Sequence, residues 1–95
     1  MPHLEFTVIG PPVSHQTRDK SNLAAWKAVI RAEAARRWAG RPPLRGKLKC
    51  TIFNFHEGED ASLDDDNMVK PIRDAMNGLV YTDDSQICHS ETKHI

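Results

Sequence analysis

The sequence lacks most features that mark secreted, membrane-bound or zinc-binding proteins. Its two cysteines, Cys50 and Cys88, are far apart and match neither a zinc-ligand spacing nor a disulfide framework. No apolar run approaches the roughly 18 residues that a membrane-spanning helix needs. The N-terminus has no secretory pattern of positive charge followed by apolar residues. We therefore expect a cytoplasmic protein with reduced thiols and no membrane partner.

Net charge is also lacking, but the neutral total conceals two halves of opposite sign. Residues 1–50 hold ten Lys and Arg against three acidic residues, a net charge of +7. Residues 51–95 hold three Lys and Arg against ten acidic residues, a net charge of −7. The halves can simply neutralise each other across one fold. Alternatively, a basic surface holds a polyanion beside an acidic site that holds cations, which is the combination a nuclease requires.

With 95 residues, the chain is near the lower end of sizes that form a core without help, and we expect a single domain, 1–95. Hydrophobic periodicity predicts a small α/β protein of the α+β type, with two layers in the order β-α-β-α-β and a small mixed sheet. The predicted strands cover residues 4–9, 48–55 and 85–95, and the second of them buries Cys50. The first predicted helix is capped by Ser21 or Asn22 and ends near Trp38. The second runs from Asp66 or Asn67 to Asn77-Gly78, with Pro71 in its first turn.

Three consecutive aspartates, Asp64 to Asp66, directly precede the second predicted helix. Like charges this close repel one another, so a bound cation would explain why they are kept together. A calcium-binding EF-hand loop is excluded, because its glycine position holds Val69 and its glutamate position holds Ala75. Helix capping accounts for one of the three carboxylates, and a solvated loop is the alternative for the other two.

A magnesium site is the functional interpretation of this cluster. Mg²⁺ prefers oxygen ligands and is usually held by a few carboxylates together with a substrate phosphate. Asp64 and Asp66 can converge on one ion, and Asp84 can face them from the start of the last predicted strand. Lys70 follows Asp66 by four residues, so the two side chains can share a helix face. A lysine there can steady a carboxylate, contact the scissile phosphate or orient the attacking water.

A longer pattern extends from Asp64 to Ile87. It reads D-x-D-N-x-x-K-P-I-x-D-A-x-N-G followed by V-Y-x-D-D-S-Q-I, and it closely resembles the RusA family of Holliday junction resolvases. The early Gly10-Pro-Pro-Val-Ser segment resembles the opening of the same family. The resemblance implies a small α/β homodimer that depends on Mg²⁺ and cuts four-way DNA junctions with paired nicks.

The resemblance also implies roles for individual residues. The family's metal ligands fall on Asp64, Asp66 and Asp84, and its functional lysine falls on Lys70; Asp83 is the reserve candidate. Acidic residues stand before Asp64, where family members often carry basic ones, so the Lys and Arg of the first half are expected to bind the DNA phosphates. The family's C-terminal strand is expected to be missing, which would leave the last strand at an exposed edge or paired with a partner subunit.

Two other functions remain open from the sequence. A restriction-like nuclease would use Asp84 with the Glu91-Thr92-Lys93 segment, and the Asp64 and Asp66 pair would then be incidental. A DNA-junction binding module would keep the basic surface without cleaving. For the homodimer, the apolar residues near Leu79, Val80 and Tyr81 are a candidate interface.

Overall fold

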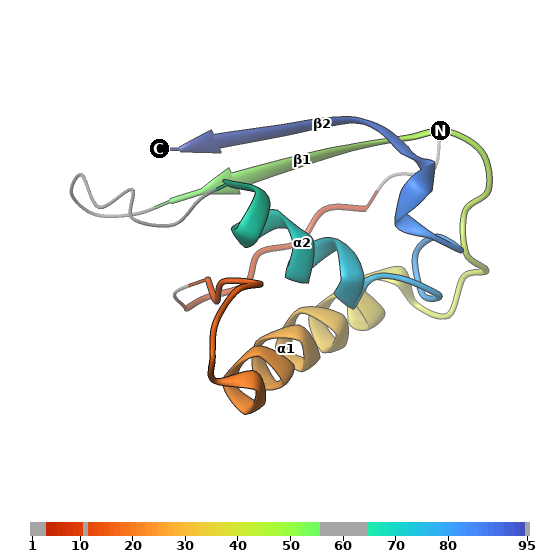
Figure 1. Ribbon diagram of the computed structural model, residues 1–95. Helices are drawn as coiled ribbons and strands as arrows, with labels where there is room; N and C mark the ends of the chain where they lie inside the picture. Colours follow the sequence, from red (N-terminus) through yellow and green to blue (C-terminus); the bar gives the residue numbers. More distant parts are fainter. Residues whose placement is uncertain (1–3, 11, 56–64, 95) are drawn as a thin grey trace.

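The computed structural model describes residues 4–10, 12–55 and 65–94 (Figure 1). Its elements are α1 (Lys20–Trp38), β1 (Leu48–Asn54), α2 (Asp65–Ala75), the 3-10 helix η1 (Asp84–Gln86) and β2 (Ile87–His94). Both helices lie on the same side of a two-stranded sheet (Figure 1). The predicted α/β class is therefore confirmed.

The first predicted strand is not formed. Residues 4–9 run outside any named strand, and the sheet of the described residues contains only β1 and β2, which are parallel rather than mixed. The alternation seen in the sequence is nevertheless real, because Leu4 and Phe6 pack against the core while their neighbours are exposed. Alternation reports which side chains are covered, whereas a strand also needs a backbone ladder to a neighbour.

Helix α1 forms where the apolar periodicity predicts it, but its N-cap is Asp19 rather than Ser21 or Asn22. The Asp19 carboxylate accepts hydrogen bonds from the Asn22 backbone amide and the Ser21 hydroxyl, both at 2.9 Å. A short acidic side chain at this position satisfies one of the free amides of the first turn. The helix ends at Trp38, because Ala39 adopts a left-handed conformation with φ of 57°.

Helix α2 contains Pro71 in its interior, not in its first turn as expected, because the helix already begins at Asp65. Proline has no amide hydrogen, so Pro71 cannot donate to the carbonyl of Asn67, four residues earlier. That carbonyl instead accepts a hydrogen bond of 2.8 Å from the backbone amide of His15. Because α2 lacks this donor, the loop before α1 can hydrogen-bond to the Asn67 carbonyl of α2.

The two strands are parallel neighbours, and α2 lies in the connection between them. The register pairs Cys50 with Ser90 and Asn54 with His94, after an irregularity next to Leu48. A parallel pair requires a long crossover, which α2 provides here. Cys50 is half-buried, and burial raises the pKa of its thiol, which agrees with the expectation that it is unreactive.

The core lies where the ends of α1 and α2 meet the segment that follows α2. Ala34 and Trp38 from α1 pack with Met76, Val80 and Tyr81. Val80 and Tyr81 are only 6% and 3% exposed, so they belong to the interior of this chain. These two side chains are therefore covered within the single chain, whereas Leu79 is only partly buried, and the dimer interface near these residues stays a prediction.

We predict that Pro71→Ala releases the loop before α1. Alanine restores an amide that competes for the Asn67 carbonyl, and the bond from His15 is worth about 1 kcal/mol. Hydrogen exchange at the His15 amide should therefore accelerate about fivefold. Pro42→Ala, which changes an exposed proline outside α2, is the control and should leave that rate unchanged. Equal exchange at His15 in the wild type and Pro71→Ala would contradict this role of the proline.

Candidate active site

Lys70 connects the acidic residues of the candidate site. Its ammonium nitrogen lies 2.7 Å from Asp74 Oδ1 and 3.1 Å from Asp84 Oδ2. Asp74 is one turn further along α2, whereas Asp84 belongs to η1, so the lysine joins two elements that are separate in the sequence. The carboxylates are largely covered, with side chains 22% and 20% exposed, while the Lys70 side chain is 46% exposed and open to solvent.

On its own helix Lys70 pairs with Asp74, four residues after it. The predicted pairing of Lys70 with Asp66, four residues before it, stays a prediction. For Asp66 the structure describes only the helical backbone, and Asp64 lies outside the described residues. The metal-ligand roles of Asp64, Asp66 and Asp84 therefore remain predictions.

The electrostatic environment of Lys70 favours its charged form. Hydrogen bonds to Asp74 first, and then to Asp84, raise the pKa of the ammonium above its ordinary value. A group whose pKa is raised on folding stabilises the protein below its unfolded pKa and loses that contribution as the pH rises through the folded one. The contribution of Lys70 is thus fully present at neutral pH and is lost only in strongly alkaline solution.

Asp84 is positioned by a small hydrogen-bonded turn. It was expected to begin the last strand but lies in η1, immediately before β2. Asp83 caps this turn by accepting from the Ser85 amide at 3.3 Å. Hydrogen bonding from the Ser85 side chain, and next from its amide, lowers the pKa of Asp83. Asp83, the reserve candidate, is therefore engaged in capping, whereas the Asp84 carboxylate is directed to Lys70. Arg73 adds a bond of 3.3 Å to the Asp84 carbonyl.

Gln86 holds this turn against the rest of the fold. Its side-chain oxygen accepts from the backbone amides of Thr82 and Asp83 at 2.9 and 3.0 Å, and also from the Thr82 hydroxyl. Its side-chain nitrogen donates to the carbonyls of Leu44 and Gly46, both at 3.0 Å. One side chain thus fixes the Asp84 turn to the connector between α1 and β1.

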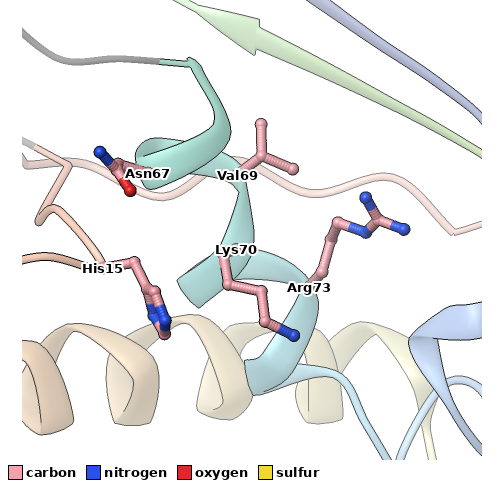
Figure 2. A pocket seen from close by; sticks show the side chains of 5 residues that line it. All are labelled: His15, Asn67, Val69, Lys70 and Arg73. Carbon is pink, nitrogen blue, oxygen red and sulfur yellow. The ribbon is translucent and has the colours of Figure 1, made fainter.

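A cavity of about 360 Å³ opens beside Lys70, between α2 and the loop before α1 (Figure 2). Figure 2 shows Lys70 extending toward α1 and Arg73 extending toward the strands. Two buried nitrogen atoms at this cavity, His15 Nδ1 and Arg73 Nε, have no hydrogen-bond partner. Arg73 was not predicted from the sequence. Asp74 matches the family pattern and lies four residues after Lys70, but helix capping and local hydrogen bonds explained it equally well.

The residues of the restriction-like alternative do not assemble around Asp84. Glu91 pairs with His89 at 3.0 Å, and this hydrogen bond lowers the pKa of Glu91. Lys93 lies over the ring of Phe53, 5.6 Å from its centre. Both contacts lie on the exposed face of the sheet, where Phe53 is 50% exposed, so the structure gives this alternative no support.

The chemistry of the site fits a hard divalent cation. The sequence has aspartates at the start of α2 and in η1, and Mg²⁺ takes carboxylate oxygens as ligands. The Asp84 carboxylate already holds a cationic group, the Lys70 ammonium, in the metal-free protein. Over the part of the chain that the structure describes, no three His, Cys, Asp or Glu residues form a cluster able to hold a metal. The fit therefore depends on Asp64 and Asp66 joining Asp84.

Fold and site together define a small α/β protein with a carboxylate and lysine centre beside a helix rich in basic residues. Comparison with protein-family models matches residues 11–95 to the family described as endodeoxyribonuclease RusA. The chain therefore belongs to the RusA family of endodeoxyribonucleases, as its motif indicated. A search of curated proteins and a search of solved structures found no match.

Family membership supports a DNA-cleaving enzyme, since the family is one of endodeoxyribonucleases. Such nucleases generally depend on a divalent metal, which agrees with the acidic character of the site. None of the helices described here is long and apolar enough to cross a membrane.

We predict that Gln86→Ala destabilises the protein and displaces Asp84. The substitution leaves the backbone groups that Gln86 serves without partners, at a cost on the order of 1–3 kcal/mol. Urea denaturation should show this loss in the free energy of unfolding. Lys47→Ala, in the connector between α1 and β1 and with an exposed side chain, is the control and should change stability by less than about 0.5 kcal/mol. Equal midpoints for the two variants would refute the role given to Gln86.

Proposed function

We propose that this protein is a Mg²⁺-dependent endodeoxyribonuclease that resolves four-way DNA junctions by paired, symmetric nicks during recombination and repair. The observation that carries the proposal is the contact between Lys70 and Asp84. Both residues belong to the segment that matches the RusA family, and folding brings them together across 14 positions of sequence. Their closeness supports a shared role at one phosphate.

The proposed chemistry is hydrolysis by in-line displacement at phosphorus. A divalent cation held by Asp64, Asp66 and Asp84 would supply Lewis-acid activation of water and of the phosphate oxygens. Lys70 donates hydrogen bonds to a phosphate oxygen and offsets the charge that develops there. Its ammonium is suited to this role, because it is partly exposed to an incoming strand and its raised pKa keeps it charged at neutral pH.

Branched DNA is the proposed partner, and the basic residues of α1 are its proposed binding surface. Part of this positive charge serves the fold itself, since Arg31 donates to the carbonyls of Ala75 and Asn77 at the end of α2. Arg36 and Arg37 share one acidic partner, Glu33, which leaves a net positive charge on an exposed face. DNA phosphates can add to these partners, and such binding weakens steeply as salt increases.

We predict that Asp84→Asn lowers the rate of junction nicking by at least about 100-fold, because asparagine keeps the shape of the side chain but removes the charge that holds the metal. Asp64→Asn and Asp66→Asn are expected to behave alike. The assay uses a labelled four-way junction with and without Mg²⁺, and junction binding without metal should persist in the variants.

Glu91→Gln is the matched control for this assay. It removes one negative charge from β2, outside the proposed centre, and should leave nicking close to that of the wild type. Full activity in Asp84→Asn would refute the metal site. Loss of activity in Glu91→Gln would favour the restriction-like alternative, and binding by the wild type without any nicks would favour a junction-binding module.

The proposed enzyme acts as a homodimer. A four-way junction presents two equivalent strands, so two symmetric nicks call for two sites related by a two-fold axis. Light scattering of the active protein should give roughly twice the chain mass of 10.7 kDa. A mass of one chain under conditions of coordinated nicking would exclude the dimer.

A further inference from the structure

Asp74 has two cationic partners from two different helices. Its Oδ1 atom accepts a hydrogen bond of 2.7 Å from Lys70, one turn earlier in α2. Its Oδ2 atom lies 3.9 Å from the ammonium nitrogen of Lys27, on α1. The Asp74 side chain is 22% exposed, and Figure 2 shows Lys70 extending toward α1, where Lys27 lies. Asp74 is thus fixed between two lysines rather than free in solvent.

Lys70 is therefore shared between two carboxylates, and the two contacts are unequal. The bond to Asp74 is 2.7 Å long and the bond to Asp84 is 3.1 Å. A cation that binds the Asp84 carboxylate repels the Lys70 ammonium, because like charges this close interact unfavourably. Lysine is a long and flexible side chain with three donors, so it needs a second anchor to remain near the site once it leaves Asp84. Asp74 is the anchor that the structure provides.

We propose that Asp74 is a positioning residue that holds Lys70 beside the carboxylate site and limits its competition with a divalent cation for Asp84. This inference rests on the proposed function, since it concerns the same site. With Asp74 present, Lys70 keeps a partner while the cation occupies Asp84, and its ammonium stays directed to the phosphate of the bound strand. Without Asp74, Asp84 is the remaining carboxylate partner of Lys70 among the described residues, so Lys70 competes with the metal for it.

An ordinary surface ion pair gives a different expectation. Pairs spaced four residues apart on an exposed helix contribute little to stability, and removing one changes nothing at a distant ligand. If Asp74 only stabilised α2 in this way, its loss would leave metal affinity unchanged. A general loss of negative charge would weaken metal binding whether or not Lys70 is present. The two effects are separated by removing Lys70 as well.

The test measures Mg²⁺ binding to the DNA-free protein by isothermal titration calorimetry. Asp74→Asn should weaken Mg²⁺ binding about tenfold, in line with residues that orient a metal ligand. In a Lys70→Met background the same substitution should have almost no further effect, because the competing ammonium is gone. Asp74→Ala is a second variant that lacks the carboxylate and suits a helix. Asp74→Ala should therefore weaken Mg²⁺ binding as much as Asp74→Asn does. Asp74→Glu keeps a carboxylate at this position and should retain most of the wild-type Mg²⁺ affinity.

Cleavage of the four-way junction provides a second measurement. At saturating Mg²⁺, Asp74→Asn should lower kcat and leave KM for the junction unchanged, since it disturbs the position of Lys70 and not the surface that binds DNA. Glu91→Gln removes a negative charge from β2, where it pairs with His89 outside the proposed centre, and should alter neither Mg²⁺ affinity nor kcat.

Two results would overturn the inference. The first is wild-type Mg²⁺ affinity in both Asp74→Asn and Asp74→Ala. The second is an equal loss of affinity in the presence and absence of Lys70, which would assign the effect to charge alone. Failure of the proposed function is recognised separately, because a wild-type protein that binds Mg²⁺ but never nicks the junction would refute the nuclease while leaving the coupling of Asp74 to Lys70 measurable.

Discussion

The ammonium of Lys70 between two carboxylates is the interaction on which the site depends. Asp84 is about four-fifths covered, and a carboxylate removed from water to that extent needs a compensating charge. Lys70 supplies this charge at 3.1 Å and connects α2 to the turn that carries Asp84. In the proposed mechanism the same lysine contacts the substrate phosphate. One contact would then serve both the stability of the metal-free protein and the cleavage of DNA.

A second constraint arises from the backbone of α2. Pro71 is buried, and a proline inside a helix leaves the carbonyl four residues earlier without its usual donor. The His15 amide donates a hydrogen bond to that carbonyl. The loop before α1 therefore lies against α2 and forms one wall of the cavity beside Lys70. A residue that is unfavourable for an isolated helix therefore shapes the surroundings of the site.

The sequence predicted those parts of the fold and site that local patterns determine. The apolar periodicity located α1 and α2, and alternation located β1, because both patterns record which side chains are buried. The motif brought Lys70 and Asp84 into one proposed site. Residues 4–9 alternate as well, but their sequence cannot show whether another strand is free to pair with them.

The contact between Lys70 and Asp74 was not predicted for a related reason. Spacing allows a lysine to meet an acid four residues before or after it, and the packing that brings Lys27 of α1 to Asp74 cannot be seen in the sequence. The apolar character of Val80 and Tyr81 was similarly ambiguous, since a core and an interface select the same residue types.

The opposite charges of the two halves meet where α1 lies beside α2. Lys27 approaches Asp74, and Arg31 binds the carbonyls at the end of α2, where a cation also complements the helix dipole. The mutual neutralisation of the halves is therefore real, but it is local. Arg36 and Arg37 lie further along α1, and the single carboxylate of Glu33 does not balance them. One helix thus joins the acidic site on one side and carries unbalanced positive charge on the other, so that the two interpretations of the charge distribution apply to different faces of α1.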